Sequence, residues 1–140
     1  METMGSPRDQ RGNPILFAVV DIAALFLFVA AGIRSHHEAS VAATFLRNAV
    51  PLAVSWLAFS QLLGTYRRYG FPTLWRTWLV AIPVALVVRT IWVGSPTGLE
   101  FLTFLGVGMG FTALFLLMGR GLVALITGRG YPQRDHRRRA

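Results

Sequence analysis

The stretch from Phe101 to Ile126, FLTFLGVGMGFTALFLLMGRGLVALI, contains a single charged residue, Arg120. A helix of a soluble domain would interrupt such a run with polar residues at helical period. At 1.5 Å per residue the stretch is roughly 39 Å long, which exceeds the hydrocarbon core of a bilayer at about 30 Å. We therefore predict a transmembrane helix that tilts or projects into the cytoplasm.

Three further apolar runs, residues 15–33, 44–63 and 74–93, precede this stretch and also have the length of a membrane span. Pro51 and Pro83 interrupt two of them, which membrane helices tolerate when neighbours satisfy the freed carbonyl. The predicted fold class is all-α: a polytopic membrane protein built as a bundle of four transmembrane helices.

The predicted domain organisation places this bundle at residues 14–127. A short polar tail, residues 1–13, precedes it, and a basic tail, residues 128–140, follows it. The first apolar run has arginines ahead of it, as a signal peptide does. It is longer than the usual h-region of about 7 to 15 residues and contains Asp21, so we interpret it as a retained helix.

The composition excludes several classes of protein. Hydrophobic residues make up 54% of the 140 residues and charged residues only 14%, which is too apolar for a soluble domain of this size. The chain has no cysteine, so disulfides and thiolate chemistry are excluded. The net charge of +8 comes from arginines that flank the apolar runs, and they form no basic stripe of the kind that binds nucleic acid.

The distribution of arginine predicts the orientation, because cytoplasmic loops carry an excess of basic residues. Most arginines fall before the first run, around the second loop and in the C-terminal tail, which predicts cytoplasmic termini in a multi-pass protein of the cell membrane. Aromatic residues at the run ends are typical of interface anchors. They are Tyr66, Tyr69, Trp75, Trp78 and Trp92.

Asp21 is the residue most informative about function, since a carboxylate inside a membrane helix must be neutralised, paired or hydrated. Arg120 lies at a similar depth in the last run, roughly 9 Å from the same side, so we expect the two to pair. Gln61 lies near that level and is expected to join them. Such a pair fixes helix register, or it serves proton or solute transport.

Small residues accompany both charges. Gly106 and Gly110 form a GxxxG motif in the last run, and we expect them to pack this helix against a neighbour.

A second polar group is expected on the opposite side of the membrane, formed by Arg34, His36, Arg47 and Arg89. Arginine binds phosphate and snorkels from helix ends, so these residues contact lipid phosphate or converge on an anion site. The run His36-His37-Glu38 is not expected to hold a metal, because adjacent loop side chains rarely coordinate one ion.

The chain contains no phosphate-binding loop, nucleophile elbow, paired carboxylates or zinc-binding helix motif. We therefore expect neither an enzyme nor a cofactor. The expected function is that of a structural or accessory protein of the plasma membrane. The alternative is a small-solute, anion or proton transporter or channel that works as an oligomer. The expected partners are the bilayer, anionic lipid headgroups around the basic tail, and, as an open alternative, further copies of the chain.

The order of these features resembles the uncharacterised four-helix membrane family called domain of unknown function 3054, over about residues 15–126. The resemblance lies in Asp21, Gly32-Ile33-Arg34-Ser35-His36, Pro51, Trp56, Gly64 with Tyr66, Arg89, and Gly119-Arg120. Where the family is expected to show a Gly-Arg pair at the end of the first helix, this chain has Gly32-Ile33. The resemblance implies a topology and no activity.

Overall fold

The computed structural model describes residues 13–35, 40–67 and 71–127. Within these ranges the regular structure is entirely helical. The helices are α1 (Pro14–Ser35), α2 (Val41–Leu63), α3 (Phe71–Val93) and α4 (Leu99–Thr127), and each contains one of the expected apolar runs. The expected tails lie outside the described residues, apart from Asn13.

Local sequence signals set several helix ends. The side-chain oxygen of Asn13 accepts the N–H of Ile15 at 3.0 Å, directly before Pro14 at the first helical position. Gly64 ends α2 with a φ of 69°, a left-handed conformation that suits glycine. The N–H of Thr65 then donates to the carbonyl of Ser60 at 2.9 Å, which closes the helix end and turns the chain back towards the bundle.

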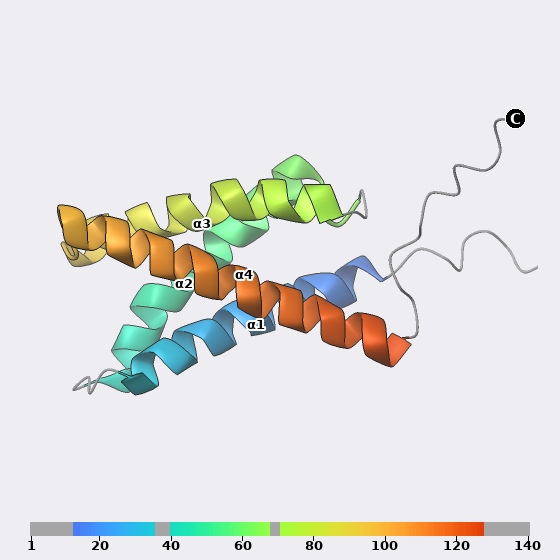
Figure 1. Cartoon of the computed structure of the whole chain (residues 1–140), viewed down its shortest axis with the longest axis horizontal. Helices are drawn as coiled ribbons and strands as arrows, with labels where there is room; N and C mark the ends of the chain where they lie inside the picture. Colours follow the sequence, from blue (N-terminus) through green and yellow to red (C-terminus); the bar gives the residue numbers. More distant parts are fainter. Residues whose placement is uncertain (1–12, 36–39, 68–70, 128–140) are drawn as a thin grey trace, which may run out of the picture.

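The four helices run alternately in opposite directions (Figure 1). The start of α1, the end of α4 and the α2–α3 turn lie at one end of the molecule, and the α1–α2 and α3–α4 connections lie at the other. Helix α1 packs against α2 and α4, and α3 packs against the same two helices. The charged residues that the sequence places at similar depths in α1 and α4 therefore belong to neighbouring helices.

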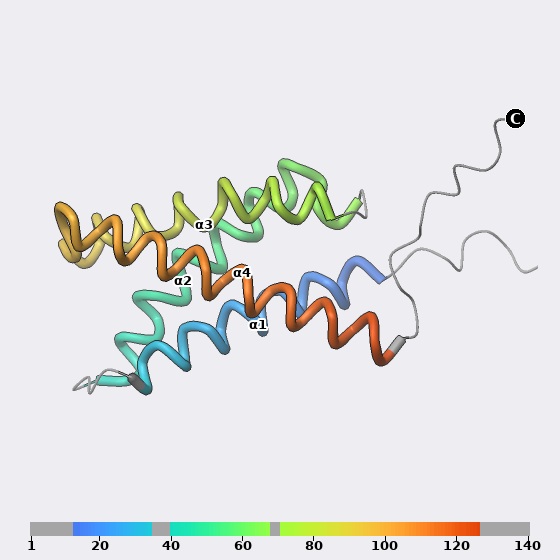
Figure 2. Tube along the Cα trace, in the orientation of Figure 1, coloured from blue at the N-terminus to red at the C-terminus, as the bar shows by residue number. Residues whose placement is uncertain are grey.

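Helix α4 changes its partner along its length (Figure 2). In its first half a Cβ on Gly108 would come within 2.9 Å of Leu86 on α3. In its second half a Cβ on Gly119 would come within 3.0 Å of Val20 on α1. The buried face of α4 therefore rotates from one half to the other.

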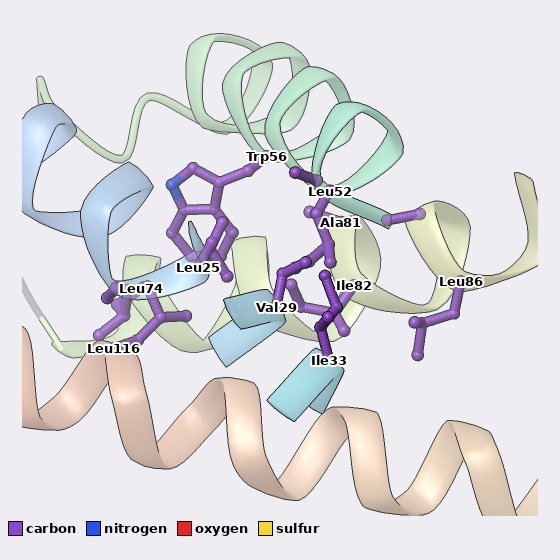
Figure 3. Packing of buried hydrophobic residues seen from close by; sticks show 13 residues of the cluster. Leu25, Val29, Ile33, Leu52, Trp56, Leu74, Ala81, Ile82, Leu86 and Leu116 are labelled. Atoms are coloured by element: carbon purple, nitrogen blue, oxygen red, sulfur yellow. The ribbon is translucent and has the colours of Figure 1, made fainter. Parts of the chain in front are cut away.

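The core lies between the four helices (Figure 3). Leu25, Trp56, Ile82 and Leu116, one from each helix, are at most 2% exposed. Most large apolar side chains nevertheless face outwards, among them Leu27, Leu62, Ile91, Leu99 and Leu125. Each of the four helices contains a span of 21 to 28 residues that is long and apolar enough to cross a membrane.

Candidate functional site

A buried ion pair joins α1 to α4. Nε of Arg120 donates to Oδ1 of Asp21 at 3.0 Å, and Nη2 donates to Oδ2 at 2.7 Å. Asp21 is 0% exposed and Arg120 is 8% exposed. Both carboxylate oxygens are engaged by one guanidinium, which is the strong, bidentate form of this contact. The predicted pairing of the two residues is present in the structure.

Two aromatic residues extend this ion pair into a polar network, defined here as Asp21, Arg120, Tyr66 and Trp56. The hydroxyl of Tyr66 donates to Oδ2 of Asp21 at 2.9 Å, and it accepts the indole N–H of Trp56 at 2.9 Å. Burial, together with the charge of Asp21, raises the pKa of Tyr66 above its ordinary value. The phenol therefore stays protonated and keeps its role as a donor to the carboxylate.

Glycines at two places allow the network to form. Gly64 gives the left-handed turn that directs Tyr66 back under the end of α2. Gly119, next to Arg120, lets α4 approach α1 closely, since a side chain there would meet Val20 and Ala24. The ring of Phe17 lies 5.5 Å from the guanidinium carbon of Arg120 and covers its face.

The structure corrects two sequence-based expectations near this network. Gln61 is exposed, because it lies one residue beyond the buried Ser60 and so points away from the bundle. Tyr66 is not an interface anchor, since it is buried and bonded to Asp21. Tyr66 therefore occupies the place in the network that the sequence predicted for Gln61.

Within the chain, Gly106 and Gly110 do not pack α4 against a neighbouring helix, contrary to the expectation. Both are exposed, and a Cβ on either would meet nothing within 4 Å. Gly108 and Gly119 make the close helix contacts instead. A GxxxG motif predicts that one face of the helix packs along a single neighbouring helix. Helix α4 instead packs on α3 in its first half and on α1 in its second half.

At the opposite end of the bundle lies a cavity of about 610 Å³, lined by all four helices and the α3–α4 turn. Its polar lining residues are Thr44, Asn48, Arg89 and Ser95. Its walls are mainly aliphatic and aromatic, and they include Phe28, Val29, Leu52, Leu86 and Phe104. The sequence contained no signal for this cavity, because it depends on how the helices diverge.

Arg89 belongs to this cavity, but the expected convergence of arginines is not seen. Arg34 and Arg47 are exposed, and neither lines the cavity. Long side chains near helix ends extend towards a polar surface, which accounts for their position. His36 and the rest of the His36-His37-Glu38 run lie outside the described residues.

Two further polar contacts, one between the α2–α3 turn and α3 and one between α3 and α4, were not expected from the sequence. The hydroxyls of Thr65 and Thr77 share a hydrogen bond, and the indole N–H of Trp78 donates to the Thr112 hydroxyl at 3.2 Å. Thr65, Thr77 and Thr112 are all buried. A single threonine in the sequence does not indicate its partner, so the sequence alone does not predict these contacts.

The fold and these contacts define an all-α protein with four helices long and apolar enough to cross a membrane, two of which are joined by a buried ion pair. A family model described as "Protein of unknown function (DUF3054)" matches residues 18–123. The chain belongs to this family, as the resemblance had indicated. No curated protein and no solved structure matches the chain.

Proposed function

We propose that this protein is a multi-pass integral membrane protein of the cell membrane with both termini in the cytoplasm. Four apolar helices that display large aliphatic side chains on their outer faces support insertion. The excess of arginine in the two tails and the second loop supports the orientation.

Within that membrane the proposed role is structural or accessory and not enzymatic. The observation that carries this proposal is the closed arrangement around Asp21, whose oxygens accept three hydrogen bonds while the residue is 0% exposed. A proton carrier needs a carboxylate that reaches water and changes its charge. A carboxylate sealed against one arginine and one phenol instead holds α1, α4 and the α2–α3 turn together.

A second candidate, a small-solute, anion or proton transporter or channel, is favoured by one observation. The cavity is of a size typical of small-molecule sites, which range over about 300 to 1,000 Å³, and it contains the side chain of Arg89. Four helices are few for a transporter, so this candidate requires an oligomer. The exposed glycines Gly106 and Gly110 offer a face for close contact between copies.

The proposed partners are the bilayer, with anionic headgroups near the basic tail, and further copies of the chain; nucleic acid is not among them. Proton and anion flux in proteoliposomes separates the two functions. The structural proposal expects no flux above that of empty liposomes. If the wild-type protein carries a pH-dependent flux that a normally folded Asp21→Asn variant loses, the carboxylate is a proton carrier and the structural proposal is wrong.

A further inference from the structure

The polar residues that line the cavity are hydrogen-bonded by the protein itself. Nε of Arg89 donates to the side-chain oxygen of Asn48 at 2.9 Å, and its Nη1 donates to the backbone carbonyl of Ser95. The side-chain amide of Asn48 in turn donates to the backbone carbonyl of Thr44 at 2.7 Å. Because these polar groups already have partners within the chain, the cavity does not require a polar ligand.

The inner part of the cavity is apolar. Leu52 and Leu86 lie one turn further inside the bundle than Asn48 and Arg89, and both leucines are 3% exposed. Aliphatic walls offer water no hydrogen bond. A void left empty there would also deprive the wall side chains of dispersion contacts. The inner part of the cavity therefore suits an aliphatic ligand.

The mouth of the cavity lies between α1 and α4. The exposed lining residues on these helices are Ala31 and Gly32 on α1 and Val107 and Phe111 on α4. Helices α1 and α4 diverge at this end, because α4 lies against α3 there (Figure 2). In a chain that spans the bilayer, as proposed above, this mouth faces the acyl chains of the surrounding lipid.

The volume of the cavity distinguishes two kinds of apolar occupant. A helix with its side chains is about 10 to 12 Å across, so a single turn of a helix from a second copy occupies roughly 500 Å³. The cavity, at about 610 Å³, has room for little more than one such turn. It lies instead within the range of about 300 to 1,000 Å³ that is typical of sites for one small ligand.

We propose that the cavity binds one acyl chain of a bilayer phospholipid. The chain enters between α1 and α4, and the headgroup stays at the membrane surface. This site rests on the membrane insertion proposed above. A bound chain fills the space that α4 leaves beside α1 where it packs against α3, and so completes the packing at this end of the bundle.

The test is photo-crosslinking of the full-length protein in nanodiscs of phosphatidylcholine. A small part of this lipid carries a diazirine in the middle of one acyl chain, and mass spectrometry locates the labelled residues. The surrounding lipid labels outward-facing residues such as Leu27 and Leu62. A chain in the cavity should label Leu52 and Leu86, which are shielded from the surrounding lipid. We call labels on these two residues the inner labels.

Two variants narrow the mouth, one from each helix. Gly32→Leu adds a side chain on α1 where a Cβ would meet nothing within 4 Å, and Val107→Trp enlarges one on α4. Each should lower the inner labels about tenfold relative to the outer ones, because the added atoms occupy space that the acyl chain needs. The controls lie outside the cavity lining. They are Gly121→Leu, at an exposed glycine, and Leu114→Trp, whose exposure of 49% matches the 52% of Val107.

Inner labels that are absent from the wild-type protein, or unchanged in a folded mouth variant, would overturn the proposal. Inner labels that disappear when several copies share one disc would mean that a second copy fills the cavity, which also overturns it. Circular dichroism shows that each variant is folded, and cysteine accessibility tests membrane insertion separately. Absence of inner labels in a correctly inserted protein therefore rejects the lipid site and leaves the proposed membrane role standing.

Discussion

At the scale of single residues, the contact between Asp21 and Arg120 has the largest energetic consequence. Each charge is buried, at 0% and 8% exposure, and each neutralises the other. Removing one partner leaves an uncompensated charge among apolar helices. The resulting loss of stability is much larger than the difference in stability between the intact ion pair and two apolar residues in its place.

The single changes Asp21→Ala and Arg120→Ala should each lower the free energy of unfolding by about 3 to 5 kcal/mol, and the double change should recover part of that loss. Denaturant titration in mixed micelles measures all three values. Arg47→Ala is the control, because Arg47 is exposed, and it should change little. Strictly additive losses in the double variant would argue against an energetic coupling of the pair.

Tyr66 links the ion pair to Trp56, so Tyr66→Phe removes one hydrogen bond on each side of the hydroxyl. We expect this variant to lose about 1 to 3 kcal/mol of unfolding free energy at neutral pH, since a buried indole N–H loses its acceptor. Trp56→Phe should cost less in the Tyr66→Phe background than in the wild type, because the two residues share one bond, although the smaller ring still loses packing in the core. A full additional loss would show that Trp56 acts mainly by packing.

The same residue predicts an alkaline pH dependence. Folding raises the pKa of Tyr66, so the protonated phenol stabilises the fold below its ordinary pKa of about 10, and this contribution is lost as the pH rises beyond it. The chain contains neither lysine nor cysteine, so tyrosines are the only side chains that titrate there. Unfolding free energy should therefore fall between about pH 9 and 11, and Tyr66→Phe should flatten this slope. An equal slope in both proteins would contradict the assignment.

At the scale of secondary-structure elements, α4 is organised by a change of partner. A Cβ added at Gly108 would meet Leu86 of α3, and one at Gly119 would meet Val20 of α1. A Cβ added at Gly106 or Gly110 would meet nothing within 4 Å. The glycines of this helix are thus not equivalent, although a sequence motif singles out the two exposed ones.

This difference predicts opposite results for two matched substitutions. Gly119→Leu should lower the free energy of unfolding by about 1 to 3 kcal/mol, because the added side chain forces α4 away from α1. Gly106→Leu should be neutral or slightly stabilising for a monomer, since it replaces an exposed glycine in a helix. Thermal unfolding in one detergent compares the two. Loss of oligomer in Gly106→Leu, seen by size-exclusion chromatography with light scattering, would instead support contact between copies.

At the scale of the whole molecule, the two ends of the bundle differ in chemistry. One end holds the closed polar network between α1, α4 and the α2–α3 turn. The other end holds the cavity with Arg89 at its polar rim. The network restrains the helices where α1 starts and α4 ends, whereas α1 and α4 diverge at the opposite end.

The proposed orientation places the α3–α4 turn outside the cell. A cysteine introduced at Ser95 should react with a membrane-impermeant maleimide added to intact cells, and a cysteine at Arg67 in the α2–α3 turn should react only after permeabilisation. The chain has no native cysteine, so no background labelling from this protein arises. The reverse pattern would mean that the termini face outwards.

The sequence by itself determined the number and position of the apolar helices, and it also pointed to Asp21 and Arg120 as partners. These features depend on residues that are close together in the sequence, or nearly so. An apolar run is recognised from consecutive residues, and a lone charge in such a run needs a partner at its own depth. Only the tertiary structure decided that Tyr66, and not Gln61, completes the network. It also decided which glycines of α4 make close helix contacts, namely Gly108 and Gly119 in place of Gly106 and Gly110. It further decided that Arg89 lines a cavity that Arg34 and Arg47 do not line. Each of these depends on how a helix is rotated about its axis and where it crosses its neighbours. A helix that is apolar on nearly every face has no amphipathic pattern, so its sequence does not indicate which face is buried.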